Sequence, residues 1–135
     1  MRRLFADTFF FYAFLNADDF AHRKAVAYSE DMTANLVTTG WVLTELADGL
    51  ARVEDRQKFV DFYRELRSDP RVMILPSSDQ LFLDGFNLYA SRPDKQWSLT
   101  DCISFSAMRS EGLTEALTGD RHFEQAGFRA LLFER

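Results

Sequence analysis

The sequence predicts a single α/β domain built on a central, mostly parallel sheet of four to five short strands. Its 135 residues suit one hydrophobic core. Short apolar or β-branched runs alternate with segments of helical spacing, which is typical of parallel strands joined by right-handed crossovers. No repeat, low-complexity tract or Pro/Gly-rich linker divides the sequence, so we expect one domain over residues 1–135.

The first half of the chain alternates between strand and helix. An apolar run over 4–6 predicts the first strand, and the segment 8–15 predicts the helix after it. Charged residues recur with helical spacing over 21–30. A β-branched run over 36–39 predicts the second strand, whereas apolar residues three or four positions apart predict a helix over 41–52.

The next segment repeats this order. Asp55 is expected to cap a helix with an apolar stripe on one face. The run Val72–Leu75, closed by Pro76, predicts the third strand. Either Ser77 or Ser78 can cap the helix that follows.

The last third of the chain is expected to hold one more long helix and two strands. Ser98 or Thr100 can cap this helix, and Gly112 is expected to end it. Short runs over 114–118 and 130–133 predict the fourth and fifth strands.

The composition limits the classes of function and location. The formal net charge of −5 argues against a passive nucleic-acid binder, but acids that converge on divalent cations would offset this charge. Fourteen phenylalanines are many for so small a core, so some are expected in a subunit interface. The single cysteine, Cys102, excludes an internal disulfide framework and favours a reducing, cytoplasmic setting. The apolar stretch over 9–15 is too short to span a bilayer, so no membrane association is expected.

Four carboxylates are expected at one edge of the sheet. In open parallel sheets, ligands bind outside the carboxyl ends of the strands. Asp7 follows the first expected strand, and Asp120 lies two residues beyond the strand that ends at Thr118. Glu45 lies in the first turns of the helix after the second strand, and Asp101 lies in the first turn of another helix. All four side chains can therefore face the same edge.

A cluster of carboxylates needs compensating charge, because like charges at close range repel and raise each other's pKa. Mg²⁺ prefers oxygen ligands and leaves coordination positions for water and phosphate oxygens. Two such ions about 4 Å apart can activate a water and stabilise the leaving oxygen of a phosphodiester. The cluster fits zinc poorly, since zinc prefers Cys and His ligands. The four acids therefore favour phosphodiester hydrolysis.

Each acid taken alone also has a structural interpretation. Asp101 can be an ordinary helix-start acid, Glu45 a residue of a solvated helix face, and Asp120 a turn residue. Asp7 is different, because apolar runs flank it on both sides and buried charges are rare unless paired or metal-bound. The prediction depends on the order and contexts of all four.

Four segments in this order resemble the PIN-domain ribonuclease family, and within it the VapC-type toxins of toxin–antitoxin pairs. They are Phe-Ala-Asp-Thr at 5–8, Thr-Glu-Leu at 44–46, Trp-Ser-Leu-Thr-Asp-Cys at 97–102 and Thr-Gly-Asp-Arg-His-Phe at 118–123. Each is common by chance, but four in the right order make a specific signal. The resemblance covers essentially the whole chain.

The resemblance implies a three-layer α/β/α PIN-like fold and a function. The expected activity is a Mg²⁺- or Mn²⁺-dependent endoribonuclease that hydrolyses phosphodiester bonds in single-stranded RNA. The expected partners are a small antitoxin, whose tail blocks the acid site, and a second copy of this chain.

The resemblance also implies roles for individual residues. The core metal ligands would be three acids: Asp7, Glu45 and Asp101. Asp120 stands where the family has Asp or Asn, so its implied contact with the metal is through water. Thr8 and Thr118 would support the cluster by hydrogen bonds.

Other residues near these segments have two interpretations each. Four of them can contact RNA phosphates or water, or can belong to solvated faces and helix starts: Lys95, Arg109, Arg121 and His122. The aromatic run 9–12 with Phe14 can stack bases, but core and dimer interface are the favoured interpretation. Cys102 is expected to be a small buried residue that allows close helix packing.

Three other functions compete with the toxin hypothesis. One is a PIN-like nuclease of RNA maturation or of structured DNA flaps, and another is a catalytically silent PIN-fold binding module. The silent module is disfavoured because all four acid positions are retained. The third, a phosphatase with an aspartyl nucleophile, usually needs a second Asp two residues after the first, where this chain has Phe9.

Overall fold

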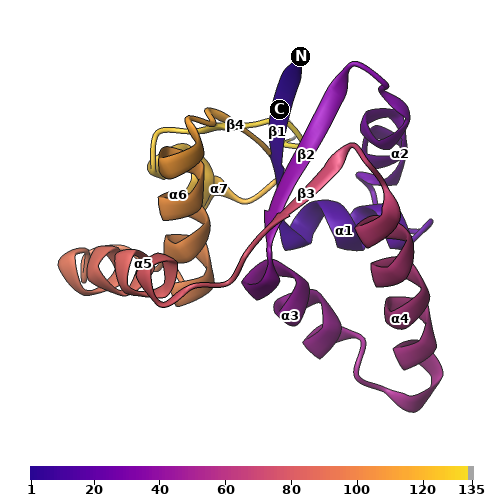
Figure 1. Ribbon diagram of the computed structural model, residues 1–135, viewed down its shortest axis with the longest axis horizontal. Helices are drawn as coiled ribbons and strands as arrows, with labels where there is room; N and C mark the ends of the chain where they lie inside the picture. The colour runs from indigo at the N-terminus through magenta and orange to yellow at the C-terminus, as the bar shows by residue number, and fades with distance from the viewer. Residues whose placement is uncertain (134–135) are drawn as a thin grey trace.

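The computed structural model describes residues 1–133 as a three-layer α/β/α domain (Figure 1). The five described strands are β1 (Arg2–Ala6), β2 (Ala34–Thr39), β3 (Val72–Leu75), β4 (Glu115–Leu117) and β5 (Arg129–Ala130). They form one sheet in the order β3-β2-β1-β4-β5, and every neighbouring pair is parallel. The predicted α/β class with a central parallel sheet is confirmed.

Seven helices are described within these residues, and they lie on both sides of the sheet. They are α1 (Thr8–Leu15), α2 (His22–Glu30), α3 (Gly40–Gly49), α4 (Val53–Ser68), α5 (Asp79–Ser91), α6 (Leu99–Glu111) and α7 (Arg121–Gln125). In Figure 1, α1, α2 and α4 lie on one side of the sheet and α6 and α7 on the other, as right-handed crossovers require. The strands run downward from the N-terminus in this view, so their carboxyl ends lie at the lower edge.

The strand order places a crevice at the carboxyl ends of β1 and β4. The chain moves outward from β1 to β2 and β3, and then crosses to β4 on the other side of β1. The residue pairs Phe5↔Ala116 and Ala6↔Leu117 align the two strands, so the segments that follow them leave the sheet side by side. Such a reversal of strand order is where ligands bind in open α/β sheets.

Apolar side chains fill both interfaces between the sheet and its helices. The largest fully buried ones include Phe5 and Leu4 of β1 and Phe11 of α1. Phe105 and Phe123 pack edge-to-face with ring centroids 4.9 Å apart, which ties α7 to α6. Within the aromatic run of α1, Phe10 and Phe11 are buried, whereas Phe9, Tyr12 and Phe14 are partly buried against the core.

Several elements differ from the sequence prediction. Arg52, and not Asp55, occupies the N-cap of α4, and Asp55 lies in its first turn. The last strand is Arg129–Ala130 and not 130–133, because the chain turns at residues 131–132. The helix α7 was not predicted, since five residues are too few to show a helical period.

Two further observations concern the sequence predictions. Cys102 is fully buried in α6, as expected. Within residues 1–133, no helix is both long enough and apolar enough to cross a membrane.

Candidate active site

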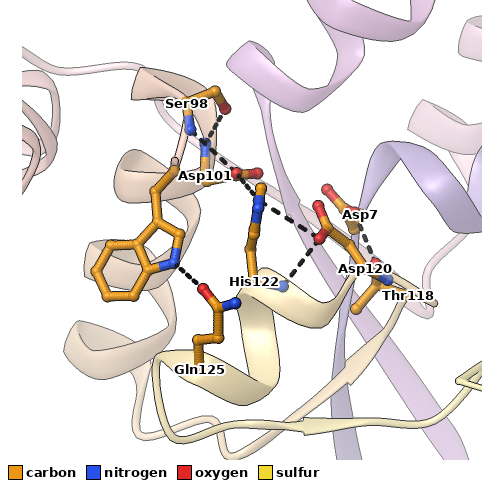
Figure 2. A network of polar contacts seen from close by, with 8 residues as sticks. Asp7, Ser98, Asp101, Thr118, Asp120, His122 and Gln125 are labelled. Carbon is orange, nitrogen blue, oxygen red and sulfur yellow. Dashed lines mark hydrogen bonds and ion pairs between the residues drawn. The ribbon is translucent and has the colours of Figure 1, made fainter. Parts of the chain in front are cut away.

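Asp7, which we call the floor, is the most buried acid of a pocket at the carboxyl ends of β1 and β4. It is the first residue after β1 and the N-cap of α1, and only 6% of its surface is exposed. The Thr118 hydroxyl, fully buried beyond the end of β4, donates a hydrogen bond of 2.9 Å to Asp7 Oδ2 (Figure 2). Asp7, the acid that apolar runs flank in the sequence, therefore lies at the crevice of the sheet.

Burial raises the pKa of Asp7 from its ordinary value of 3.8 to about 7. The hydrogen bond from Thr118 acts in the opposite direction, and the nearby Asp101 and Glu45 carboxylates raise the pKa further. The ionised form of Asp7 is thus disfavoured unless a positive charge lies close to it. A divalent cation at the pocket would supply that charge.

Asp101 lies on the rim of the pocket, in the first turn of α6, and two donors fix its carboxylate. Ser98 and Asp101 form a capping box, in which the Ser98 N–H lies 3.1 Å from Asp101 Oδ2. The ring nitrogen Nδ1 of His122 lies 3.0 Å from the same oxygen. Within the described residues no hydrogen bond to Oδ1 is found, which leaves that oxygen for a ligand. Burial raises the pKa of Asp101, and the contacts with His122 and Ser98 lower it in part.

The short helix α7 adds Asp120 and His122 to the rim. Asp120 caps this helix, with its Oδ1 accepting a hydrogen bond of 2.9 Å from the His122 N–H. Its own N–H donates to the Thr118 hydroxyl oxygen over 3.1 Å. Thr118 therefore links the floor to the rim, because it donates to Asp7 and accepts from Asp120 (Figure 2).

Glu45 completes the rim from α3. Thr39 starts this helix by accepting a hydrogen bond from the Val42 N–H. Glu45 is exposed, and the buried Thr8 hydroxyl donates a hydrogen bond of 2.6 Å to its Oε1. Thr8 follows Asp7 directly, so one residue supplies the floor carboxylate and the next residue orients the rim carboxylate of Glu45.

One open pocket of about 440 Å³ contains all four predicted acids. Its lining also includes Gln96 and Ser98, for which the sequence analysis gave no place in the site. Ser98 was predicted only as a helix cap, and nothing in the sequence marks Gln96, which lies in a loop. Trp97 between them is buried and donates to Gln125 Oε1 over 3.0 Å, which holds this loop against α7.

The four residues expected to contact RNA fall into different places. His122 lines the acid pocket, and Lys95 lines a separate depression. Arg109 lies in the last turn of α6, over the ring of Phe128, and Arg121 lies over the ring of Phe133. The pocket lining thus contains no lysine or arginine among the described residues.

The donor set fits a divalent cation. The pocket brings together four carboxylates, and the ion pairs found in the described part of the chain connect them to no lysine or arginine. Ligand atoms of Asp101, Asp120 and His122 lie within 4.8 Å of one another, close enough to share one ion, whereas Asp7 and Glu45 are not part of this group. The four carboxylates of the pocket offer the oxygen ligands that Mg²⁺ and Mn²⁺ prefer.

Comparisons with known proteins agree with this architecture. The crystal structure of VapC20 from Mycobacterium tuberculosis, a toxin that cleaves the sarcin-ricin loop, has a TM-score of 0.82 and 26% identity, covering 93% of this chain and 95% of that one. VapBC2 from Rickettsia felis, crystallised with a promoter DNA fragment, has a TM-score of 0.69 at 14% identity over 95% and 96% of the two chains. FitAcB from Neisseria gonorrhoeae has a TM-score of 0.64 at 18% identity over 94% of each.

Two comparisons at the sequence level complete this result. No curated protein matches the sequence significantly. The family model of the PIN domain, in contrast, matches residues 4–129. This match spans β2, β3 and β4 in full and parts of β1 and β5, and it includes all four acids of the pocket. The chain therefore belongs to the PIN-domain family.

Proposed function

We propose that this chain is a metal-dependent endoribonuclease that cuts single-stranded RNA and serves as the toxin of a type II toxin–antitoxin pair. The observation that carries the proposal is the convergence of Asp7, Glu45, Asp101 and Asp120 on one pocket at the carboxyl ends of β1 and β4. The similarity to VapC20, a toxin that cleaves the sarcin-ricin loop, supports RNA as the substrate class.

Each acid has its own support in this proposal. Mg²⁺ or Mn²⁺, when bound, would polarise a phosphate oxygen and activate a water. Asp7, Glu45 and Asp101 would hold the ion directly, and Asp120 would contact it through water. Thr118 orients Asp7, Thr8 orients Glu45, and Ser98 with His122 orients Asp101. These hydrogen bonds keep the carboxylates in place before RNA arrives, which reduces the reorganisation needed for catalysis.

The same proposal includes a protein partner and a second copy of this chain. Similar structures include VapBC2 and FitAcB, which supports a small antitoxin that blocks the acid pocket. Exposed aromatic residues on α5 support a homodimer that buries them: Phe82, Phe86 and Tyr89. The proposed location is the cytoplasm. A gene for a small DNA-binding protein immediately upstream would support the toxin role, and a gene standing alone would weaken it.

The experiment that tests the activity compares purified wild type with Asp101→Asn on labelled single-stranded RNA in Mg²⁺. We expect cleavage by the wild type, abolition of cleavage by EDTA, and at least about 100-fold slower cleavage by the variant. Asn retains the ability to accept the helix-capping hydrogen bond, so the circular dichroism spectrum should be unchanged. Asp18→Asn, at an exposed position away from the pocket, is the matched control. Undiminished cleavage by Asp101→Asn would refute the assignment of the site.

A further inference from the structure

Phe9 and Phe20 form an aromatic ledge beside the acid pocket. Phe9 lies in the first turn of α1, two residues after Asp7, and lines the same pocket as the acids. Phe20 lies between α1 and α2, with its ring centroid 6.1 Å from that of Phe9 at an interplanar angle of 77°. Although its side chain is apolar, Phe20 is 70% exposed. The ledge therefore extends from the pocket to an aromatic ring that faces solvent.

Gly119 fixes the inner half of this ledge against the acids. A Cβ atom at position 119 would lie 2.5 Å from Phe9 Cζ, so the ring could not keep its place beside any other residue. Gly119 stands between Thr118, which binds Asp7, and Asp120. The absence of a side chain at this position thus lets the Phe9 ring lie directly against the segment that carries the rim acid Asp120.

The pocket needs a means of holding RNA that uses little positive charge. Its described lining contains four carboxylates and no lysine or arginine. Bound cations would hold one phosphate at the acids, but they would not bind the bases of the RNA strand. Stacking of a base on an aromatic ring requires no charge and accepts every base, because each base has a π-face. An exposed phenyl ring next to the acids meets this requirement.

We propose that the aromatic ledge is a nucleobase-binding subsite, at which Phe20 stacks a base close to the phosphate held by the acids. This inference rests on the proposed ribonuclease function and adds a contact to the substrate. Phe20 contacts the ring of Phe9, which lines the acid pocket, whereas Phe82 of α5 contacts Trp41, which does not. The subsite would act through shape and stacking, so it would tolerate different bases.

Binding measurements test the ledge in the Asp7→Asn background, in which RNA is expected to stay intact. The probe is a fluorescein-labelled single-stranded octaribonucleotide, titrated in Mg²⁺ and followed by anisotropy. We expect Phe20→Ala and Phe20→Leu to weaken binding about fivefold or more, and Phe20→Trp to retain it, because only Trp keeps an aromatic face. Val53→Ala, at an exposed apolar residue of α4 outside the pocket, is the control and should bind as the parent does.

Abasic substitution identifies the contact. Each position of the octamer is replaced in turn by an abasic nucleotide, and the effect of Phe20→Ala is measured with each probe. Stacking on Phe20 requires one position at which the abasic probe already binds weakly and Phe20→Ala weakens it no further. Equal affinity of parent and Phe20→Ala, or a loss that persists with every abasic probe, would overturn the subsite. Cleavage by the wild type is assayed separately. If the wild type cleaves RNA but Phe20→Ala binds RNA as tightly as its parent, the subsite is refuted and the proposed ribonuclease function is not.

Discussion

The floor and the rim of the acid pocket present the same kind of side chain in different surroundings. Asp7, on the floor, follows a buried strand, and its side-chain donor is the neutral hydroxyl of Thr118. Asp101, on the rim, is held by a backbone N–H at a helix start and by the imidazole of His122. Burial raises the pKa of both carboxyls, and both lie at helix starts, but Asp7 is buried whereas Asp101 is only partly buried. We therefore expect the floor to depend on a bound cation more than the rim does.

The largest effect is expected from Asp7→Asn, which should separate activity from stability. Cleavage should fall by at least about 100-fold, since the variant lacks the buried ligand. The metal-free protein should gain about 4 kcal/mol in free energy of unfolding at pH 8, because Asn keeps the shape without the buried charge. Chemical denaturation in EDTA at pH 8 measures this gain. Asp18→Asn should show neither change. A lower free energy of unfolding in Asp7→Asn would mean that the buried Asp7 carboxylate does not destabilise the metal-free protein.

The pH dependence of stability sharpens the same comparison. Folding raises the pKa of Asp7 to about 7, well above its unfolded value near 4. Between these values the folded state binds the proton more tightly, so the contribution of Asp7 to stability falls as pH rises from about 4 to 7 and then levels off. In EDTA, the advantage of Asp7→Asn over the wild type should therefore grow across this window. An advantage that is constant from pH 4 to 8 would contradict the raised pKa.

On the rim, His122→Ala is expected to reduce cleavage about 10- to 100-fold, mainly by weakening metal affinity. The contact between His122 Nδ1 and Asp101 Oδ2 fixes the carboxylate, and alanine removes it. His122→Asn keeps an N–H donor near the position of Nδ1 and should recover most of the activity. The other histidine, His22, contacts the backbone oxygen of Ala13 outside the pocket, so His22→Asn should leave metal affinity unchanged. Equal activity in His122→Ala and wild type would exclude this positioning role.

The sequence was informative where a local pattern determines the placement. Asp7 stands between two apolar runs, and the end of a parallel strand is a known place for ligands, so its position was predictable. Asp101 was predictable because Ser98 three residues earlier marks a helix start. The parallel sheet followed from the alternation of strand-like and helix-like segments, and the structure confirms it.

Long-range contacts account for what the sequence did not show. The helix α7 is one turn long and is fixed by the packing of Phe123 on Phe105, not by a helical period of its own. The last strand pairs with Glu115 and Ala116 of β4 and is only two residues long, which is too short for a strand pattern in the sequence. Neither Gln96 in the pocket lining nor the fit of Gly119 under Phe9 has any local signature. These features depend on which segments the fold brings together.

Thr118→Val tests the link between floor and rim and should have a smaller effect than the loss of His122. Valine has nearly the same shape but cannot donate to Asp7 or accept from the Asp120 N–H. The pKa of Asp7 should rise further, since this hydrogen bond lowers it, and cleavage should fall about tenfold. Thr118→Ser keeps the hydroxyl and should retain most of the activity. A serine variant as impaired as the valine variant would indicate that packing, and not the hydrogen bond, is what matters at this position.

The smallest effect is expected on the exposed side of the rim, where Thr8→Val removes the donor to Glu45. Glu45 is exposed and free to rotate once its 2.6 Å hydrogen bond is lost, so ordering it around a cation should cost about 1 kcal/mol. That cost corresponds to about a fivefold higher Mg²⁺ concentration for half-maximal cleavage. Because Thr8→Val retains the Glu45 carboxylate, saturating Mg²⁺ should restore the maximal rate of this variant. It should not restore the rate of Asp7→Asn, which lacks the Asp7 carboxylate. Metal titrations of both variants measure this difference. If high Mg²⁺ fails to rescue Thr8→Val, then Thr8 acts on the floor as well, and the two parts of the pocket are not separable.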